Sequence, residues 1–158
     1  MCGIWAIFGS DEDVRTYFDA ALKVKHRGPD AFRFETIHNV PGCWLGFHRL
    51  AIVDDLAGMQ PMRLYEYPHI WLICNGEIYN HKSISKDFGF QRRTECDSEV
   101  IIHLYVKGGI EFAAKQLDGV FAFVLLDANK RKVYLGRDTF GIRPMFKLQN
   151  AHGFLAVC

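Results

Sequence analysis

Cys2 is the residue whose type and position most directly suggest chemistry. Because it is small and follows Met1, removal of the methionine would leave a thiol and a free α-amine on one residue. An α-amine has a pKa of about 7.7 to 8.0, so it can accept the thiol proton near neutral pH. The resulting thiolate is a strong nucleophile toward a carboxamide carbon. The simpler interpretation, a small apolar residue near the start of the chain, stays open on position alone.

Asn75 and Gly76 follow an apolar run, residues 70–74, that is typical of a strand. We therefore expect an amide side chain and an unhindered backbone N–H at the tip of that strand. Such a pair can donate hydrogen bonds to a developing oxyanion. The alternative is an ordinary Asn-Gly turn.

Arg49 lies between Phe47-His48 and the apolar residues 50–53, in a region that we expect to be a largely buried strand. A guanidinium in such surroundings requires a carboxylate partner, because its donors match carboxylate geometry in a bidentate pair. The partner could be the α-carboxylate of an amino-acid substrate. A structural ion pair with Asp54 or Asp55 is equally compatible with the local sequence.

Asp97 and Glu77 are carboxylates that could hold an α-ammonium group. Asp97 also fits a helix N-cap, and Glu77 a solvated turn charge. The histidines His38, His103 and His152 are isolated and form no ligand pattern, so we expect no metal site. Neither a Walker pattern nor a glycine-rich dinucleotide loop occurs, so no cofactor, ATP included, is expected to bind these residues.

Hydrophobic periodicity predicts the elements that must position these side chains. Strands are expected at residues 3–8, 31–37, 42–47, 50–53 and 69–74, with a hairpin of residues 120–126 and 132–136 and a last pair at 145–148 and 153–157. Helices are expected at residues 14–24 and 98–107, the second closed by Gly108-Gly109. Short connections favour antiparallel pairing and a mixed domain in which helices cover sheets.

The composition indicates one globular domain. The chain has 158 residues, of which 49% are hydrophobic and 14% aromatic, and its formal net charge is +1. This balance gives no broad field that favours nucleic acid or a membrane surface, so we expect neither partner. No run is long enough to span a membrane and no signal peptide is evident, which favours the cytosol. Five cysteines without paired spacing indicate free thiols. The chain stops at Cys158 in an apolar run, so we expect a fragment of a longer protein.

Four segments together resemble the class II glutamine amidotransferases, which are N-terminal-nucleophile hydrolases. They are Met1-Cys2-Gly3-Ile4, residues 46–54 (GFHRLAIVD), residues 75–80 (NGEIYN) and residues 97–101 (DSEVI). The order and spacing of these segments make a chance match improbable. The resemblance covers residues 1–158 and implies an α+β fold, a four-layer αββα sandwich of two mainly antiparallel sheets.

The resemblance also implies roles, residue by residue. Cys2 is the expected nucleophile and its α-amine the base. Asn75 and Gly76 are the expected oxyanion donors. The glutamine-binding set is Arg49 for the carboxylate, Asp97 and Glu77 for the α-ammonium, and the main chain around Leu50 and Ile52, together with Asn75 and Gly76.

Residues 26–30 (HRGPD) and 75–80 resemble the versions found in asparagine synthetases. That family continues into a domain that binds ATP and Mg and amidates aspartate, which nothing here matches. The resemblance thus implies glutamine as substrate and a synthetase domain in the parent chain, and it admits a homodimer. Two alternatives stay open: a class II amidotransferase with a sugar-phosphate acceptor, and a catalytically silent glutamine-binding or dimerisation module.

Overall fold

Two antiparallel sheets face each other in the computed structural model, which describes residues 1–51 and 58–158. The five-stranded sheet has the strand order β2 (Ala31–Thr36), β3 (Trp44–Arg49), β1 (Gly3–Phe8), β8 (Leu155–Val157), β7 (Lys147–Gln149). The three-stranded sheet has the order β4 (Ile70–Ile78), β5 (Gly119–Asp127), β6 (Lys132–Arg137). Every strand pairing is antiparallel.

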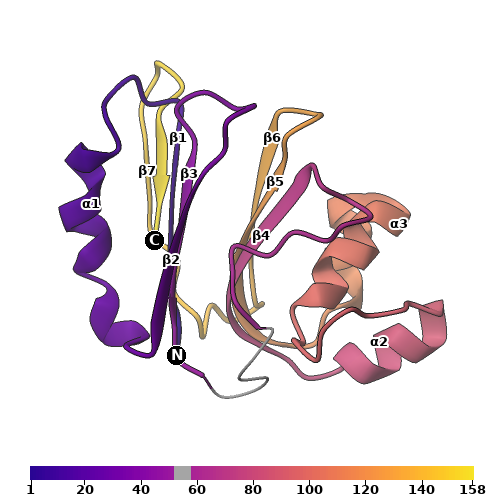
Figure 1. The fold of residues 1–158 in the computed structure, drawn as a ribbon. Coiled ribbons are helices and arrows are strands. Elements are labelled where there is room, and N and C mark those ends of the chain that lie inside the picture. The colour runs from indigo at the N-terminus through magenta and orange to yellow at the C-terminus, as the bar shows by residue number, and fades with distance from the viewer. Residues whose placement is uncertain (52–57) are drawn as a thin grey trace.

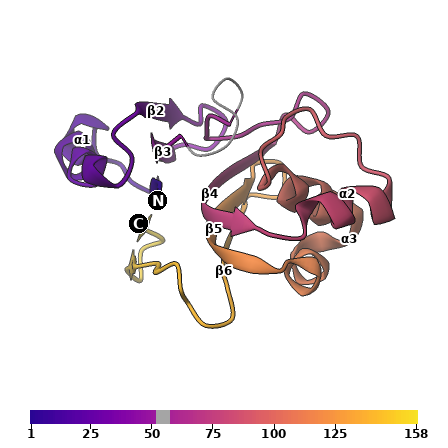
Figure 2. The ribbon, with the colours of Figure 1, turned by 90° about the horizontal axis from the view of Figure 1, so that it is seen from below.

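Helices cover the outer faces of both sheets. Helix α1 (Arg15–Leu22) and the short 3-10 turn η1 (Lys25–Arg27) lie beside the five-stranded sheet, and α2 (His81–Phe88) and α3 (Glu99–Gln116) lie beside the three-stranded sheet (Figure 1). Figure 2 shows the same arrangement from below, with α1 and the α2–α3 pair on opposite sides of the molecule. The predicted four-layer αββα architecture is therefore confirmed.

Strand β1 is buried along its whole length because both of its faces are covered. Ile4, Ala6 and Phe8 pack between the sheets, whereas Trp5 and Ile7 pack toward α1. Burying one such aliphatic or aromatic side chain contributes about 1.5 to 3 kcal/mol to the hydrophobic term. The alternation fixes the register of the strand, and it places Cys2 at the end of the layer between the two sheets.

Strand β4 alternates in the same way. Trp71 and Ile73 face the five-stranded sheet, and Leu72 and Cys74 face the helices. Since β4 continues to Ile78, the next residue on the inward face is Asn75.

The prediction for Asn75 and Gly76 is wrong in one respect. They lie inside β4, paired with Ala122 and Phe121 of β5, and neither at a strand tip nor in a turn. The backbone of Gly76 has φ +147°, and a Cβ there would overlap the carbonyl oxygen of Val120. Pairing with β5, which local sequence does not reveal, outweighs the turn preference of Asn-Gly.

Strand β1 has the predicted bounds, and most of the other predicted elements are found with shifted bounds. Helix α3 kinks at Gly109 but continues to Gln116, so its second part was missed. Helix α2 was also missed, because Ile84 is its only buried residue and gives no clear apolar stripe. The predicted strand at residues 50–53 is wrong for Leu50 and Ala51, which form no strand, while residues 52–53 lie outside the described residues. Both predicted hairpins are confirmed as β5–β6 and β7–β8. None of the helices in the described ranges is long and apolar enough to cross a membrane.

Candidate active site

Cys2 lies directly before β1, half-buried, and its sulfur contacts the main chain of Leu50. The Cys2 Sγ is 3.5 Å from the Leu50 backbone nitrogen, which donates to it, and 3.7 Å from the Leu50 carbonyl oxygen. Pairing of Gly3 with His48 holds the start of β1 against the end of β3. The Leu50 main chain, which was predicted to belong to the glutamine pocket, thus lies next to Cys2.

Asp30 holds this stretch of main chain in place. Its backbone nitrogen donates to the carbonyl oxygen of Arg49 at 3.0 Å, and its carboxylate accepts from the nitrogen of Ala51 at 2.7 Å. Leu50 is therefore fixed on both sides by one residue of the 26–30 segment. This explains how a segment without an assigned role supports the backbone that contacts Cys2.

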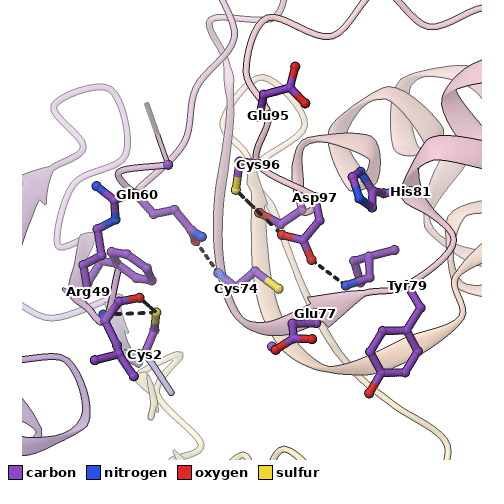
Figure 3. A pocket seen from close by; sticks show the side chains of 16 residues that line it. Cys2, Arg49, Gln60, Cys74, Glu77, Tyr79, His81, Glu95, Cys96 and Asp97 are labelled. Carbon is purple, nitrogen blue, oxygen red and sulfur yellow. Dashed lines mark hydrogen bonds between the residues drawn. The ribbon is translucent and has the colours of Figure 1, made fainter. Parts of the chain in front are cut away.

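A cavity of about 310 Å³ opens between the two sheets next to Cys2, within the range of volumes that small-molecule sites usually have. Arg49, at the end of β3 and only 8% exposed, lines it on the same side as Cys2. Figure 3 shows Cys2 and Arg49 on one side of the cavity and Asp97 and Glu77 on the other. The cavity thus combines a thiol, a guanidinium and two carboxylates.

Asp97 binds β4 rather than capping a helix. Its carboxylate accepts a hydrogen bond from the backbone nitrogen of Ile78 at 2.5 Å, and the residue at the N-cap position of α3 is Ser98. The predicted N-cap role is therefore wrong, because a backbone donor of the neighbouring sheet takes the carboxylate instead. Glu77 belongs to β4, paired with Val120, so its interpretation as a turn charge is also wrong. Both side chains line the cavity.

Gly76 lines the cavity, whereas the preceding residue, Asn75, lies on the inward face of β4 and is not one of the residues that line it. Asn75 is 4% exposed, and its Oδ1 atom has no hydrogen-bond partner among the described residues. An unsatisfied buried polar atom is uncommon and requires an explanation, such as a group that arrives with a ligand. A half-turn of the amide exchanges oxygen and nitrogen, so this side chain can present either an acceptor or a donor.

Ile52, the remaining member of the predicted glutamine-binding set, lies outside the described residues, as do Asp54 and Asp55, the alternative partners of Arg49. The structure brings Cys2, Arg49, Leu50, Gly76, Glu77 and Asp97 together at one cavity, with Asn75 beside it.

Several residues at the cavity were missed by sequence analysis. Gln60 is 5% exposed and its Oε1 atom accepts from the backbone nitrogen of Cys74 at 2.5 Å. His81 lines the cavity and accepts a hydrogen bond from Arg92 at 3.1 Å through Nδ1. Burial and the charge of Arg92 lower the pKa of His81, so it is neutral near neutral pH. Neither residue belongs to a pattern of chemically paired types, so sequence gave no signal for them.

Two further thiols, those of Cys74 and Cys96, line the cavity. Burial raises the pKa of both, with the charge of Asp97 adding to the effect. They therefore stay protonated near neutral pH and are poor nucleophiles. All five cysteines are free thiols, as predicted.

Known proteins are similar to this chain in sequence and in fold. A family model described as a glutamine amidotransferase domain matches residues 1–158. The chain is 58% identical over its whole length to the asparagine synthetases [glutamine-hydrolyzing] of Homo sapiens, Bos taurus and Gallus gallus. It spans 28% of the length of these relatives.

Among solved structures, the glutamine phosphoribosylpyrophosphate amidotransferase of B. subtilis is similar in fold. The match has a TM-score of 0.73 and 19% sequence identity, and it covers 98% of this chain and 41% of that one. At this identity the likeness concerns the fold alone, and it agrees with the predicted α+β sandwich. From the family model, which matches all 158 residues, we conclude that the chain belongs to the family of glutamine amidotransferase domains.

Proposed function

We propose that this domain hydrolyses glutamine to glutamate and ammonia, with Cys2 as the nucleophile. The observation that carries the proposal is the convergence on one cavity of the Cys2 thiol, the Arg49 guanidinium and the carboxylates of Asp97 and Glu77. Opposite charges at a cavity of this size suit an amino-acid zwitterion. A thiol beside them suits attack on the side-chain amide.

Arg49 would bind the α-carboxylate of glutamine, because its planar fork pairs with both oxygens. Asp97 and Glu77 would bind the α-ammonium group from the opposite side of the cavity. The main chain of Leu50, already held by Asp30, and that of Ile52 complete the pocket in this proposal. With both charged ends fixed, the side-chain amide is directed toward Cys2.

Activation of the thiol requires that Met1 be removed. Met1 is 45% exposed, so its peptide bond is accessible to an aminopeptidase. The freed α-amine of Cys2 then accepts the Sγ proton, and the thiolate attacks the amide carbon. The protonated α-amine of Cys2 then gives the proton to the leaving nitrogen. Ammonia departs, and a γ-glutamyl thioester on Cys2 remains. Water adds to the thioester with the α-amine again as base and releases glutamate.

Asn75 and Gly76 would hold the oxyanion of both tetrahedral intermediates. The buried amide of Asn75 supports this role in its flipped orientation, because its NH2 group would then take the place of the unpaired Oδ1 and donate to the substrate oxygen. Loss of a single oxyanion donor costs about 2.7 to 4 kcal/mol of transition-state stabilisation in other enzymes.

In the full-length protein we propose that residues 1–158 form the glutaminase domain and that a C-terminal synthetase domain uses the ammonia. That domain would bind ATP and Mg and convert aspartate to asparagine, whereas the glutaminase domain needs no cofactor. The identity of 58% to animal asparagine synthetases supports aspartate, and not a sugar phosphate, as the acceptor of the ammonia. A cytosolic location and a homodimer belong to the same proposal.

A glutaminase assay on protein with verified Met1 removal tests the proposal. Wild-type protein should release ammonia from glutamine, and Cys2→Ser should lower kcat by at least about 1,000-fold. Turnover that survives in Cys2→Ser would exclude Cys2 as the nucleophile. Glutamine binding without turnover in the wild type would favour a silent binding module.

A further inference from the structure

Glu99 is a buried carboxylate in the first turn of α3, and the mechanism above does not use it. It is fully buried and accepts four hydrogen bonds. The donors are the backbone nitrogen of Arg93 at 2.7 Å, the backbone nitrogen and hydroxyl of Thr94 at 2.8 and 2.7 Å, and Nε2 of His103 at 3.1 Å.

An ion in this position is costly unless it is fully hydrogen-bonded. Burial alone would raise the pKa of Glu99, but hydrogen bonds from His103, Thr94 and the backbone amides outweigh it and lower the pKa. Glu99 is therefore ionised near neutral pH. Because a buried ionised carboxylate is costly, we expect a role of Glu99 other than packing.

Three of the four donors belong to residues 92–98, called here the 92–98 loop, which lie between α2 and α3. This loop carries Asp97. The hydroxyl of Thr94 that donates to Glu99 also accepts from the backbone nitrogen of Cys96 at 3.1 Å. The next residue, Asp97, reaches the backbone of Ile78. A short chain of hydrogen bonds thus leads from Glu99 to the residue directly before Asp97.

The two ion pairs of this loop each include a more exposed side chain, while Arg92 also donates to His81 at 3.1 Å. Arg93 pairs with Glu66, with side chains 64% and 34% exposed, and Arg92 lies 3.4 Å from Glu95, which is 77% exposed. Solvent screens such pairs, so they fix a loop less firmly than a buried carboxylate with four donors. Glu99 is thus a fully buried carboxylate that binds this loop through three hydrogen bonds.

We propose that Glu99 is a positioning residue for recognition of the substrate α-ammonium group, because it holds the 92–98 loop in the conformation that places Asp97 at the cavity. The inference rests on the proposed function for the identity of the substrate. It predicts that loss of Glu99 weakens binding of ligands that have an α-ammonium group and spares ligands that lack it.

The test measures equilibrium binding to the full chain with Met1 removed and Cys2 replaced by Ser, so that no ligand is consumed. Two ligands are compared by calorimetry: glutamine, and 4-carbamoylbutanoate, which is glutamine without its α-amino group. Glu99→Gln should weaken glutamine binding about tenfold. The glutamine side chain at position 99 has only one acceptor oxygen, and its NH2 group would face hydrogen-bond donors of the loop, so the loop would no longer hold Asp97 in place. The effect of Glu99→Gln on binding of 4-carbamoylbutanoate should stay within about twofold.

Glu111→Gln is the matched control, since Glu111 lies exposed on the same helix. It should change neither affinity. Equal weakening of both ligands by Glu99→Gln would overturn the proposal, as would unchanged glutamine binding. In the Asp97→Asn background, Glu99→Gln should cause no further loss of glutamine affinity, and an additional tenfold loss would also overturn it.

Thr94→Val provides a test if Glu99→Gln does not fold, because it removes one donor and keeps the carboxylate. A smaller loss confined to glutamine supports the proposal, and a loss shared by both ligands contradicts it. The binding measurements and the glutaminase assay can fail independently of each other. Selective weakening in a protein that releases no ammonia would remove the hydrolysis proposal but support the role of Glu99. A protein that binds no glutamine would overturn both.

Discussion

The sulfur of Cys2 and the backbone nitrogen of Leu50 lie 3.5 Å apart, although 48 positions separate the two residues in sequence. Leu50 follows directly after Arg49, so the nucleophile and the proposed carboxylate-binding residue are linked through one short piece of main chain. Small shifts of this segment would therefore move both groups together.

Alkylation should distinguish Cys2 from the buried thiols. Burial raises the pKa of Cys43 to about 12 and raises the pKa of Cys74 and Cys96, whereas Cys2 is half-buried and Cys158 exposed. Iodoacetamide near neutral pH should therefore modify Cys2 and Cys158 in native protein and spare the other three. Glutamine should slow modification of Cys2 alone, as peptide mass spectrometry can show. Equal protection of Cys158 would argue against a glutamine site at Cys2.

Arg49→Lys should raise KM for glutamine with little change in kcat. A lysine ammonium is a point charge and cannot form the bidentate pair, and loss of a charged hydrogen bond costs about 1.5 to 3 kcal/mol, or about 10- to 100-fold in KM. Arg33→Lys, in an exposed ion pair with Glu35 on β2, is the control and should leave KM unchanged. Steady-state kinetics would contradict the assignment if both variants behaved alike.

Gly76→Ala should damage both stability and activity. Its Cβ would overlap the carbonyl oxygen of Val120, so β4 and β5 would have to separate at this point. We expect a loss of about 2 to 4 kcal/mol in the free energy of unfolding, measured in urea. At Gly89 the backbone also has positive φ, but a Cβ there would have nothing within 4 Å, so Gly89→Ala should lose only about 1 kcal/mol. Similar losses in the two variants would show that the overlap does not matter.

Asp138 should make stability depend on acid pH. It is 6% exposed, and its carboxylate accepts from four backbone amides, those of Phe121, Phe140, Ile142 and Arg143. Burial would raise its pKa, but these amides outweigh burial and lower it below the ordinary value of 3.8. The folded state therefore gains stability from Asp138 above pH 3.8, and this gain disappears as the pH falls through the lower folded pKa.

Asp138→Asn should accordingly cost about 1 to 3 kcal/mol at neutral pH, and the difference from wild type should shrink as the pH falls below 3.8. Asp19→Asn, at an exposed position of α1, should have no comparable effect. Urea unfolding at several pH values measures both. A difference that stays constant into acid would contradict the ionised role of Asp138.

Sequence patterns predicted the elements whose hydrophobic order is local. Strand β1 is found with the predicted bounds, and the β5–β6 hairpin follows from alternating strands around a polar turn. Helix α2 escaped prediction because burial of a single residue leaves little pattern. Patterning of this kind reports which face is covered, and it fails where an element has almost no covered face.

The candidate site could be predicted in its residue types but not in its contacts. Asp97 resembles a cap in local sequence, yet its partner is Ile78, 19 positions away. Asn75 and Gly76 have a turn signature, yet pairing with β5 makes them part of a strand. Gln60 gave no signal, and Glu99 lay in the 97–101 segment without an assigned role, since a single amide or carboxylate acquires a role only when the fold brings its donors together.

The central claim is that a free α-amine and the thiol of Cys2 together make the nucleophile. It is tested most directly by treating protein with a diazoketone analogue of glutamine, which alkylates an activated thiol at the position of the scissile amide, and locating the adduct by peptide mass spectrometry. We predict one adduct, on Cys2, only in molecules that lack Met1, with loss of ammonia release in proportion to labelling. An adduct on another residue, or equal labelling and turnover in molecules that retain Met1, would contradict the account.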